Sequence, residues 1–62
     1  MVDIILYSRR DLNGDWHIRN RMGRYERGSR EYAAARKAAE TAQMRWHACE
    51  PATEFRIEDV EL

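Results

Sequence analysis

The stretch that decides the fold is residues 30–49, REYAAARKAAETAQMRWHAC. Apolar side chains recur in it at spacings of three and four, and they are Tyr32, Ala35, Ala39, Ala42, Trp46 and Cys49. This spacing places all six on one side of a single long helix. Alanine, the strongest helix former, dominates the stretch. Small side chains on the buried stripe would let the helix lie close to the surface that it covers.

Both ends of this helix carry residues that commonly mark helix ends. Ser29 is a candidate N-cap, because its hydroxyl can accept a hydrogen bond from a free amide of the first turn. Glu31 suits the positive end of the helix dipole. Pro51 stops the helix and disfavours helical geometry at Glu50. The sequence therefore predicts one helix from about residue 30 to about residue 49.

Short stretches with β-strand alternation flank the helix, and they are residues 2–8, 16–21, 24–27 and 53–60. The first two are expected to pair through a turn at Asn13-Gly14, a preferred pair for tight hairpins. In the second stretch, strict alternation points Trp16 and Ile18 one way and places His17 and Arg19 on the other face. The stretch 24–27 is either a short strand of its own or part of a turn. In the last stretch, Phe55 and Ile57 point inward.

The order of these elements predicts a single α+β domain over residues 1–62, in the order β-β-(β)-α-β. It has two layers: an antiparallel sheet of three or four strands, and one long helix packed on one face of that sheet. The other face of the sheet is then bare. The residues expected on the bare face are Ile5, Tyr7, His17, Arg19 and Arg56.

The chain is small for an independently folding domain. With 62 residues, a single core supplies only about 3–5 kcal/mol of net stability, and Trp16 and Trp46 are expected among its members. Cys49 is the only cysteine, which rules out an internal disulfide and suggests a reducing compartment. A homodimer would bury more apolar surface, and the composition leaves that alternative open.

The N-terminal residues do not have the pattern of a targeting segment. Residues 1–7 lack the basic leader of a signal peptide. No stretch reaches the roughly 20 apolar residues that a membrane-spanning helix needs. We therefore expect a soluble, cytoplasmic protein with no membrane partner.

Charge is balanced overall but unevenly distributed. Residues 1–30 hold seven arginines and four acids, a net charge of +3, whereas residues 31–62 hold four cations and seven acids, a net charge of −3. Ten of the eleven cations are arginine, which forms planar paired contacts with carboxylates and phosphates and stacks on aromatic rings. Five arginines fall close together around Tyr25, and they are Arg19, Arg21, Arg24, Arg27 and Arg30.

Catalytic and metal-binding patterns are weak in this sequence. His47 and Cys49 offer two metal ligands, but a structural zinc site needs four. Cys49 lies on the helix stripe, where it is expected to act as a small hydrophobic residue. A cysteine–histidine nucleophile pair needs an orienting group and oxyanion donors, and the three glycines are separate turn residues rather than a phosphate loop. We expect no enzyme activity, no cofactor and no metal.

One stretch of the chain resembles a known type of domain. Residues 13–19, NGDWHIR, the following Gly23-Arg24-Tyr25, Ser29 and the alanine-rich helix resemble the N-terminal arm-type DNA-binding domain of phage-type tyrosine recombinases. They also resemble small bacterial and phage proteins with the same strand–strand–helix–strand outline. The resemblance covers about residues 13–42. Arm-type domains use the exposed sheet face on DNA, and the resemblance implies that face here to be His17, Arg19 and Arg21.

Together these features favour a non-catalytic interaction module, such as a phage or bacterial accessory protein. The neutral total charge and the acidic last strand favour a protein over nucleic acid as the partner. The predicted contact residues lie on the Arg-rich hairpin and the exposed sheet face, and they are Tyr7, His17, Arg19, Arg21, Arg24, Tyr25 and Arg27. Binding of double-stranded DNA through the same residues is the alternative.

Overall fold

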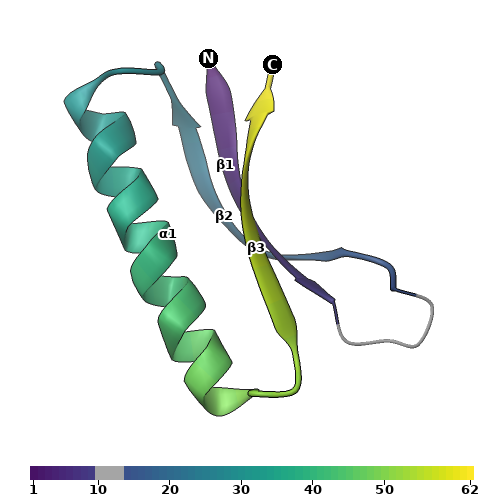
Figure 1. Cartoon of the computed structure of the whole chain (residues 1–62). Helices are drawn as coiled ribbons and strands as arrows, with labels where there is room; N and C mark the ends of the chain where they lie inside the picture. Colours follow the sequence, from purple (N-terminus) through teal and green to yellow (C-terminus); the bar gives the residue numbers. More distant parts are fainter. Residues whose placement is uncertain (10–13) are drawn as a thin grey trace.

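The computed structural model describes residues 1–9 and 14–62 and contains one sheet and one helix. The elements follow in the order β1 (Val2–Arg9), β2 (His17–Tyr25), α1 (Arg30–Cys49) and β3 (Glu54–Glu61). The sheet is antiparallel in the order β2-β1-β3, so the first strand is central, and α1 lies along one side of the sheet (Figure 1). The predicted two-layer α+β architecture is confirmed, with three strands in the described residues.

The first hairpin differs from the prediction in one respect. The stretches 16–21 and 24–27 belong to one continuous strand, β2, which begins after Trp16. Gly23, predicted as a turn, lies inside this strand with a positive φ of 105°, a conformation that glycine adopts without steric cost. Of the predicted turn, Asn13 lies outside the described residues, and Gly14 has a φ of 78°.

The helix has the predicted limits because both caps form. The hydroxyl of Ser29 accepts a hydrogen bond from the backbone N–H of Tyr32 at 3.1 Å. At the other end, the N–H of Glu50 donates to the carbonyl of Trp46 at 2.8 Å, and Pro51 follows. These bonds satisfy backbone groups that a helix end leaves without intrahelical partners.

The core lies between β1 and the middle of α1. Val2, Ile4 and Leu6 are fully buried, and Ile4 packs with Ala35 and Ala39. Other apolar side chains surround this cluster and are half-buried, and they are Met22, Tyr25, Tyr32 and Ile57. Ile57 points to the helix layer, as predicted.

Cys49 is an exception to the predicted helix stripe, because it is exposed. Its side of the last helical turn lines an open groove between α1 and β2, together with Trp46 and Asn20. The prediction that Cys49 is a buried hydrophobic residue is therefore wrong. The stripe is covered fully only where the helix crosses β1.

Two irregularities in the pairing of β1 with β2 determine which way the β2 side chains face. In the first, Ile4 pairs with Gly23 and Ile5 with Arg21, so Met22 is an extra residue. In the second, Leu6 pairs with Asn20 and Tyr7 with Ile18, so Arg19 is extra. An extra residue of this kind is a β-bulge, and it shifts the alternation by one.

As a result, every third residue of β2 faces away from the helix, and these residues are Ile18, Arg21 and Arg24. Arg19 contacts Trp46 of α1, and His17 pairs with Ser8, a residue on the helix side of β1. The expectation that Arg19 and His17 lie on the bare face is wrong, because strict alternation does not hold across a bulge.

Candidate interaction surface

The open face is the side of the sheet that α1 does not cover (Figure 1). Ile4 faces the helix, so alternate residues of β1 and their strand partners face the opposite way. The open face consists of Asp3, Ile5, Tyr7 and Arg9 of β1, Ile18, Arg21 and Arg24 of β2, and Glu54, Arg56, Glu58 and Val60 of β3. Ile5, Tyr7 and Arg56 lie on this side as predicted, but the expectation that Ile5 is bare is wrong, because its side chain is only 3% exposed.

Arg21 and Arg24 are the unengaged cations of the open face. Both side chains are exposed. In the described part of the chain, neither makes a hydrogen bond or an ion pair. They pair with Ile5 and Asp3 of β1, two residues apart, so they stand about 7 Å from each other along the strand. The two guanidinium groups are therefore available to contact another molecule together.

The hairpin end of the open face is occupied by stacked side chains. Trp16, which precedes β2, has the guanidinium of Arg56 at 4.6 Å and that of Arg9 at 4.9 Å from its ring centroid. Arg56 also lies 5.5 Å from the ring of Tyr7. These distances are within cation–π range. Trp16, predicted in the core, instead joins β1 and β3 on the open face.

Ion pairs complete this stack. Arg9 binds both carboxylate oxygens of Glu54, at 2.7 and 2.8 Å, and Arg56 binds Glu58 at 3.1 Å. Arg9 and Arg56 therefore have partners within the chain. The side chains at the hairpin end of the open face are therefore held in place by contacts within the chain.

Arg19 has a structural role on the helix side of the sheet. Its guanidinium lies 4.5 Å from the ring centroid of Trp46 and 5.9 Å from that of Phe55. It also donates to both oxygens of Glu50, at 2.9 and 3.0 Å, and the two side chains are only 29% and 23% exposed. This arginine joins β2 to the C-terminal end of α1.

We predict that Arg19→Ala lowers the free energy of unfolding by about 1–2 kcal/mol, because a paired ion contact and an aromatic stack are lost together. Arg21→Ala, the matched control two residues away, changes it by less than about 0.5 kcal/mol. Urea denaturation followed by circular dichroism measures both values. Equal losses for the two variants would contradict the structural role of Arg19.

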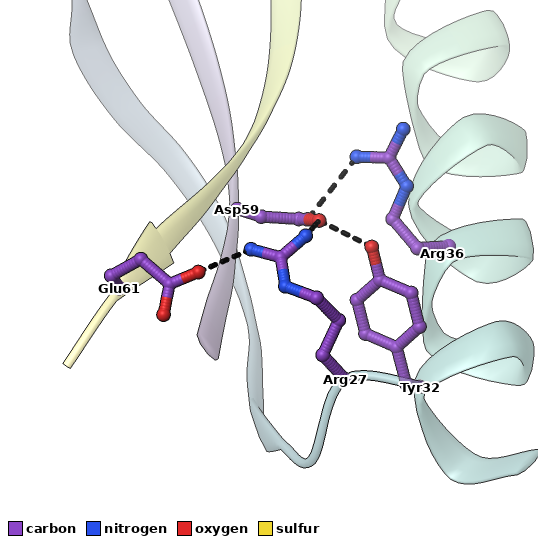
Figure 2. Close-up of polar contacts among 5 residues, drawn as sticks. All are labelled: Arg27, Tyr32, Arg36, Asp59 and Glu61. Carbon is purple, nitrogen blue, oxygen red and sulfur yellow. Dashed lines mark hydrogen bonds and ion pairs between the residues drawn. The ribbon is translucent and has the colours of Figure 1, made fainter. Parts of the chain in front are cut away.

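Arg27 is also engaged within the chain, in a cluster around Asp59 (Figure 2). Arg27 lies 3.4 Å and Arg36 3.3 Å from the carboxylate of Asp59, which also accepts a hydrogen bond from the hydroxyl of Tyr32. Arg27 binds Glu61 as well. The Asp59 side chain is only 15% exposed. The cluster joins the turn before α1, the start of α1 and the end of β3.

Hydrogen bonds in this cluster change proton affinities. The bond to Asp59, with burial as a smaller cause, raises the pKa of Tyr32 above its ordinary value of 10.0. The bond to Glu61 raises the pKa of Arg27, although an arginine side chain is charged at all ordinary pH values without this bond.

We predict that the free energy of unfolding falls as the pH rises above 10.0, the ordinary pKa of Tyr32. The folded chain keeps the phenol proton at pH values where the unfolded chain has lost it. Because the pKa of Tyr32 is higher in the folded chain, the proton stabilises the folded chain fully at pH values below the pKa of the unfolded chain. This stabilisation is lost as the pH rises through the pKa of the folded chain. Urea titrations between pH 8 and pH 11 should show a shallower decline for Tyr32→Phe than for the parent chain, and parallel declines would contradict this assignment.

The seven predicted contact residues do not form one surface. Tyr7, Arg21 and Arg24 share the open face. Tyr25 packs on the core, and its hydroxyl donates to the carbonyl of Met22 at 2.8 Å. The others face the helix side or hold the turn before α1, and they are His17, Arg19 and Arg27. Ile18, which strict alternation places on the opposite face from His17 and Arg19, belongs to the open face and is 52% exposed.

No group of three or more histidine, cysteine or acidic side chains in residues 1–9 and 14–62 could hold a metal ion. The one helix in the described chain is not apolar enough to cross a membrane. No protein-family model, curated protein or solved structure matches the chain. The resemblance to arm-type recombinase domains therefore stays a prediction.

Proposed function

We propose that the chain is a small non-catalytic module that binds a protein partner through its open face. The observation that carries the proposal is the pair Arg21 and Arg24, exposed side by side without a partner in the described chain. Ile18 stands beside them as an exposed apolar contact. A role as a phage or bacterial accessory protein is part of this proposal and rests on the resemblance alone.

The mixture of side chains on the open face supports a protein partner. Arginine and aromatic residues are enriched in protein interfaces, and this face holds Arg21, Arg24, Tyr7 and Trp16. Its β3 side carries charges of both signs, with Glu54 paired to Arg9 and Glu58 paired to Arg56. Such a mixture suits a protein surface that carries charges of both signs better than a uniformly negative phosphate backbone.

The charges of the open face also indicate what the partner presents. The β2 side offers two guanidinium groups, which bind carboxylates in planar, paired geometry. The partner is therefore expected to place acidic side chains over β2.

Charge removal at matched positions tests the proposal. The immobilised parent chain should capture a partner protein from the cytosol of its own cell. The double variant Arg21→Ala with Arg24→Ala should fail to capture that protein. The control double variant Arg30→Ala with Lys37→Ala removes the same charge from exposed positions of α1 and should retain that protein. Equal capture by both variants would show that another surface binds.

Site-specific cross-linking identifies the contact directly. A photoreactive side chain at Ile18 on the open face should attach to the partner protein. The same group at Met44, which belongs to α1 and is 73% exposed, should not. Cross-links from Met44 alone would overturn the proposal.

The alternative is binding of double-stranded DNA through the same two arginines. Their spacing and lack of internal partners favour it. Two phosphate contacts predict that the logarithm of the binding constant falls with the logarithm of the salt concentration with a slope of about −2. Gel retardation of generic duplex DNA at low and at physiological salt measures this slope. Absence of retardation at low salt excludes the alternative.

A further inference from the structure

We infer that the chain forms a homodimer in which the outer edge of β3 pairs with the β3 of a second copy, antiparallel and centred on Ile57. The two sheets then join into one continuous sheet with both helices on the same side. This inference goes beyond the proposed function, because it uses the edge of the sheet and leaves the open face available to another protein.

The outer edge of β3 presents backbone groups at every second residue. The N–H of Leu62 donates to the carbonyl of Met1 at 3.2 Å, so the backbone of residue 62 is directed toward β1. The direction of the backbone groups alternates along an antiparallel strand. The residues of β3 whose N–H and C=O groups point away from β1 are therefore Phe55, Ile57, Asp59 and Glu61.

This edge is regular and uncovered along its length. β3 pairs with β1 from Glu61 to Glu54 without a register shift. In Figure 1, β3 lies in front of the other two strands, and no described element lies over it. The side chain of Gln43 donates to the carbonyl of Phe55 at 3.0 Å, which agrees with the outward direction of that carbonyl. A carbonyl oxygen can accept a second hydrogen bond, so another strand can still align there.

A second copy of β3 matches this edge in length and direction. A two-fold axis perpendicular to the sheet brings two β3 strands together antiparallel, with the same face of each sheet on the same side. Two registers keep nearly the whole strand paired. One is centred on Ile57 and pairs residues 54–60 of both copies, and the other is centred on Glu58 and pairs residues 55–61.

The charges of β3 select the register centred on Ile57. In that register Arg56 lies opposite Glu58 of the second copy, and this pair occurs twice. The register centred on Glu58 sets this carboxylate against its own copy. Opposite charges directly across an antiparallel pair stabilise it, and like charges destabilise it.

The ion pair between Arg56 and Glu58 within the chain does not prevent the contact between copies. It consists of one hydrogen bond of 3.1 Å, and the two side chains are 50% and 47% exposed. A guanidinium group has five N–H donors. Arg56 can therefore bind the carboxylate of its own chain and that of the second copy together.

The acidic side chains of β3 are neutralised within the chain. Charged side chains on an outer strand commonly discourage the addition of another strand. Here each acid has an arginine partner, and the pairs are Glu54 with Arg9, Glu58 with Arg56, Asp59 with Arg27 and with Arg36, and Glu61 with Arg27. Two β3 strands therefore meet without the repulsion that the sequence of this strand alone suggests.

Pairing would also cover apolar side chains that the single chain leaves half-exposed. Phe55, Ile57 and Val60 are all in this state. Ile57 would meet Ile57 of the second copy on the helix side of the joined sheet. A core of the size found in this 62-residue chain supplies little net stability without staples or oligomerisation, so this added burial favours the dimer.

The two helices leave room for the pairing. α1 packs on Ile4 of the central strand through Ala35 and Ala39. In the joined sheet the two β1 strands would be three strand spacings apart, about 14 Å. Helices that touch have axes about 8–10 Å apart. The helices of the two copies would therefore lie side by side without a clash.

The contact is small, so the dimer is expected to be weak. Ile57 with Ile57, and Phe55 with Asp59 on either side, exchange about six backbone hydrogen bonds. The paired length is about 24 Å, which is short compared with the interfaces of stable complexes. We expect a dissociation constant of about 100 µM, and the test must reach about 1 mM.

Amide hydrogen exchange, measured by NMR at about 50 µM and about 1 mM, locates the contact. The amides of Ile57 and Asp59 should exchange at least about twofold more slowly at the higher concentration, because the second copy covers them. Arg24 provides the control on the opposite edge of the sheet. It pairs with Asp3, whose backbone bonds toward β3, so the N–H of Arg24 also points outward and should exchange at one rate.

Backbone methylation tests the hydrogen bonds without changing a side chain. A chain of 62 residues can be prepared by chemical synthesis with an N-methyl group at Ile57, whose N–H has no partner strand in the monomer. Sedimentation equilibrium should show a dimer for the parent chain and at least about tenfold weaker association for this variant. The same group at Arg24 should leave association unchanged. Circular dichroism verifies that both variants are folded.

Disulfide formation tests the register, and it also covers the case in which the methylated chain does not fold. With Cys49→Ser as background, Arg56→Cys and Glu58→Cys chains are mixed and oxidised. Residues 56 and 58 face each other across the two-fold axis at a Cα separation of about 4.5 Å, which suits a disulfide. Mass spectrometry should find the mixed dimer at least about threefold more abundant than the two like dimers together.

Each outcome decides the inference. Slower exchange at Ile57, weaker association after its methylation and an excess of the mixed disulfide support the β3 dimer. A parent chain that stays monomeric up to about 1 mM overturns it, as does a dimer that methylation of Ile57 leaves intact, or a disulfide that joins like chains as readily as unlike ones. The proposed function is tested separately, because Arg21 and Arg24 lie on the open face and outside this contact.

Discussion

Ile4→Ala is expected to reduce the stability so far that a substantial fraction of the molecules is unfolded at room temperature. Ile4 is fully buried in the central strand and packs on Ala35 and Ala39, two side chains too short to fill the space left by the substitution. Loss of a buried isoleucine costs about 2–5 kcal/mol. The whole net stability expected for a core of this size is about 3–5 kcal/mol, so the substitution removes most of it.

Ile18→Ala is the matched control, because it is the same substitution on the neighbouring strand at a side chain that is 52% exposed. It should change the free energy of unfolding by less than about 0.5 kcal/mol. Urea denaturation at a low protein concentration, where any association is weak, measures both effects. Similar losses for Ile4→Ala and Ile18→Ala would mean that the core does not lie between β1 and α1.

Asp59→Ala is expected to have the second largest effect, a loss of about 2–3 kcal/mol in the free energy of unfolding. The carboxylate of Asp59 is the shared acceptor for the Tyr32 hydroxyl and the guanidinium groups of Arg27 and Arg36 (Figure 2). Its removal leaves the Tyr32 hydroxyl and the Arg36 guanidinium without this acceptor, whereas Arg27 keeps its ion pair with Glu61. The Arg27–Glu61 ion pair would then be the remaining polar contact of this cluster between the turn before α1 and the end of β3.

Two further variants separate this cluster from an ordinary surface pair. Glu54→Ala removes an exposed carboxylate from its pair with Arg9 and should cost no more than about 1 kcal/mol. Tyr32→Phe removes a single donor from Asp59 and should cost about 1 kcal/mol. If Asp59→Ala cost no more than Glu54→Ala, the cluster would contribute nothing beyond a surface ion pair.

The fold could be predicted largely because its signals are local. Ser29, Glu50 and Pro51 mark the helix ends through hydrogen bonds and backbone restrictions that involve only neighbouring residues. The alternation of Phe55 and Ile57 in the last strand is likewise a period-two pattern without interruption. For such segments, the identities of a few neighbouring residues are enough to predict the local structure.

The candidate site could be predicted only in part, because it depends on departures from such patterns. The bulge at Met22 places Arg21 and Arg24 on one face, although a regular strand would separate them. Gly23 was the available signal, since a glycine inside a strand pattern often marks a bulge. Nothing local indicated that Arg19 would bind Glu50, 31 residues away.

The bulges of β2 also affect how the sheet behaves toward other strands. β2 is an edge strand, and a regular edge is a template on which strands of unrelated molecules can add. The extra residues Arg19 and Met22 break the even row of backbone donors and acceptors along this edge. The irregularities that direct two arginines outward therefore also make the β2 edge a poor template for the addition of further strands.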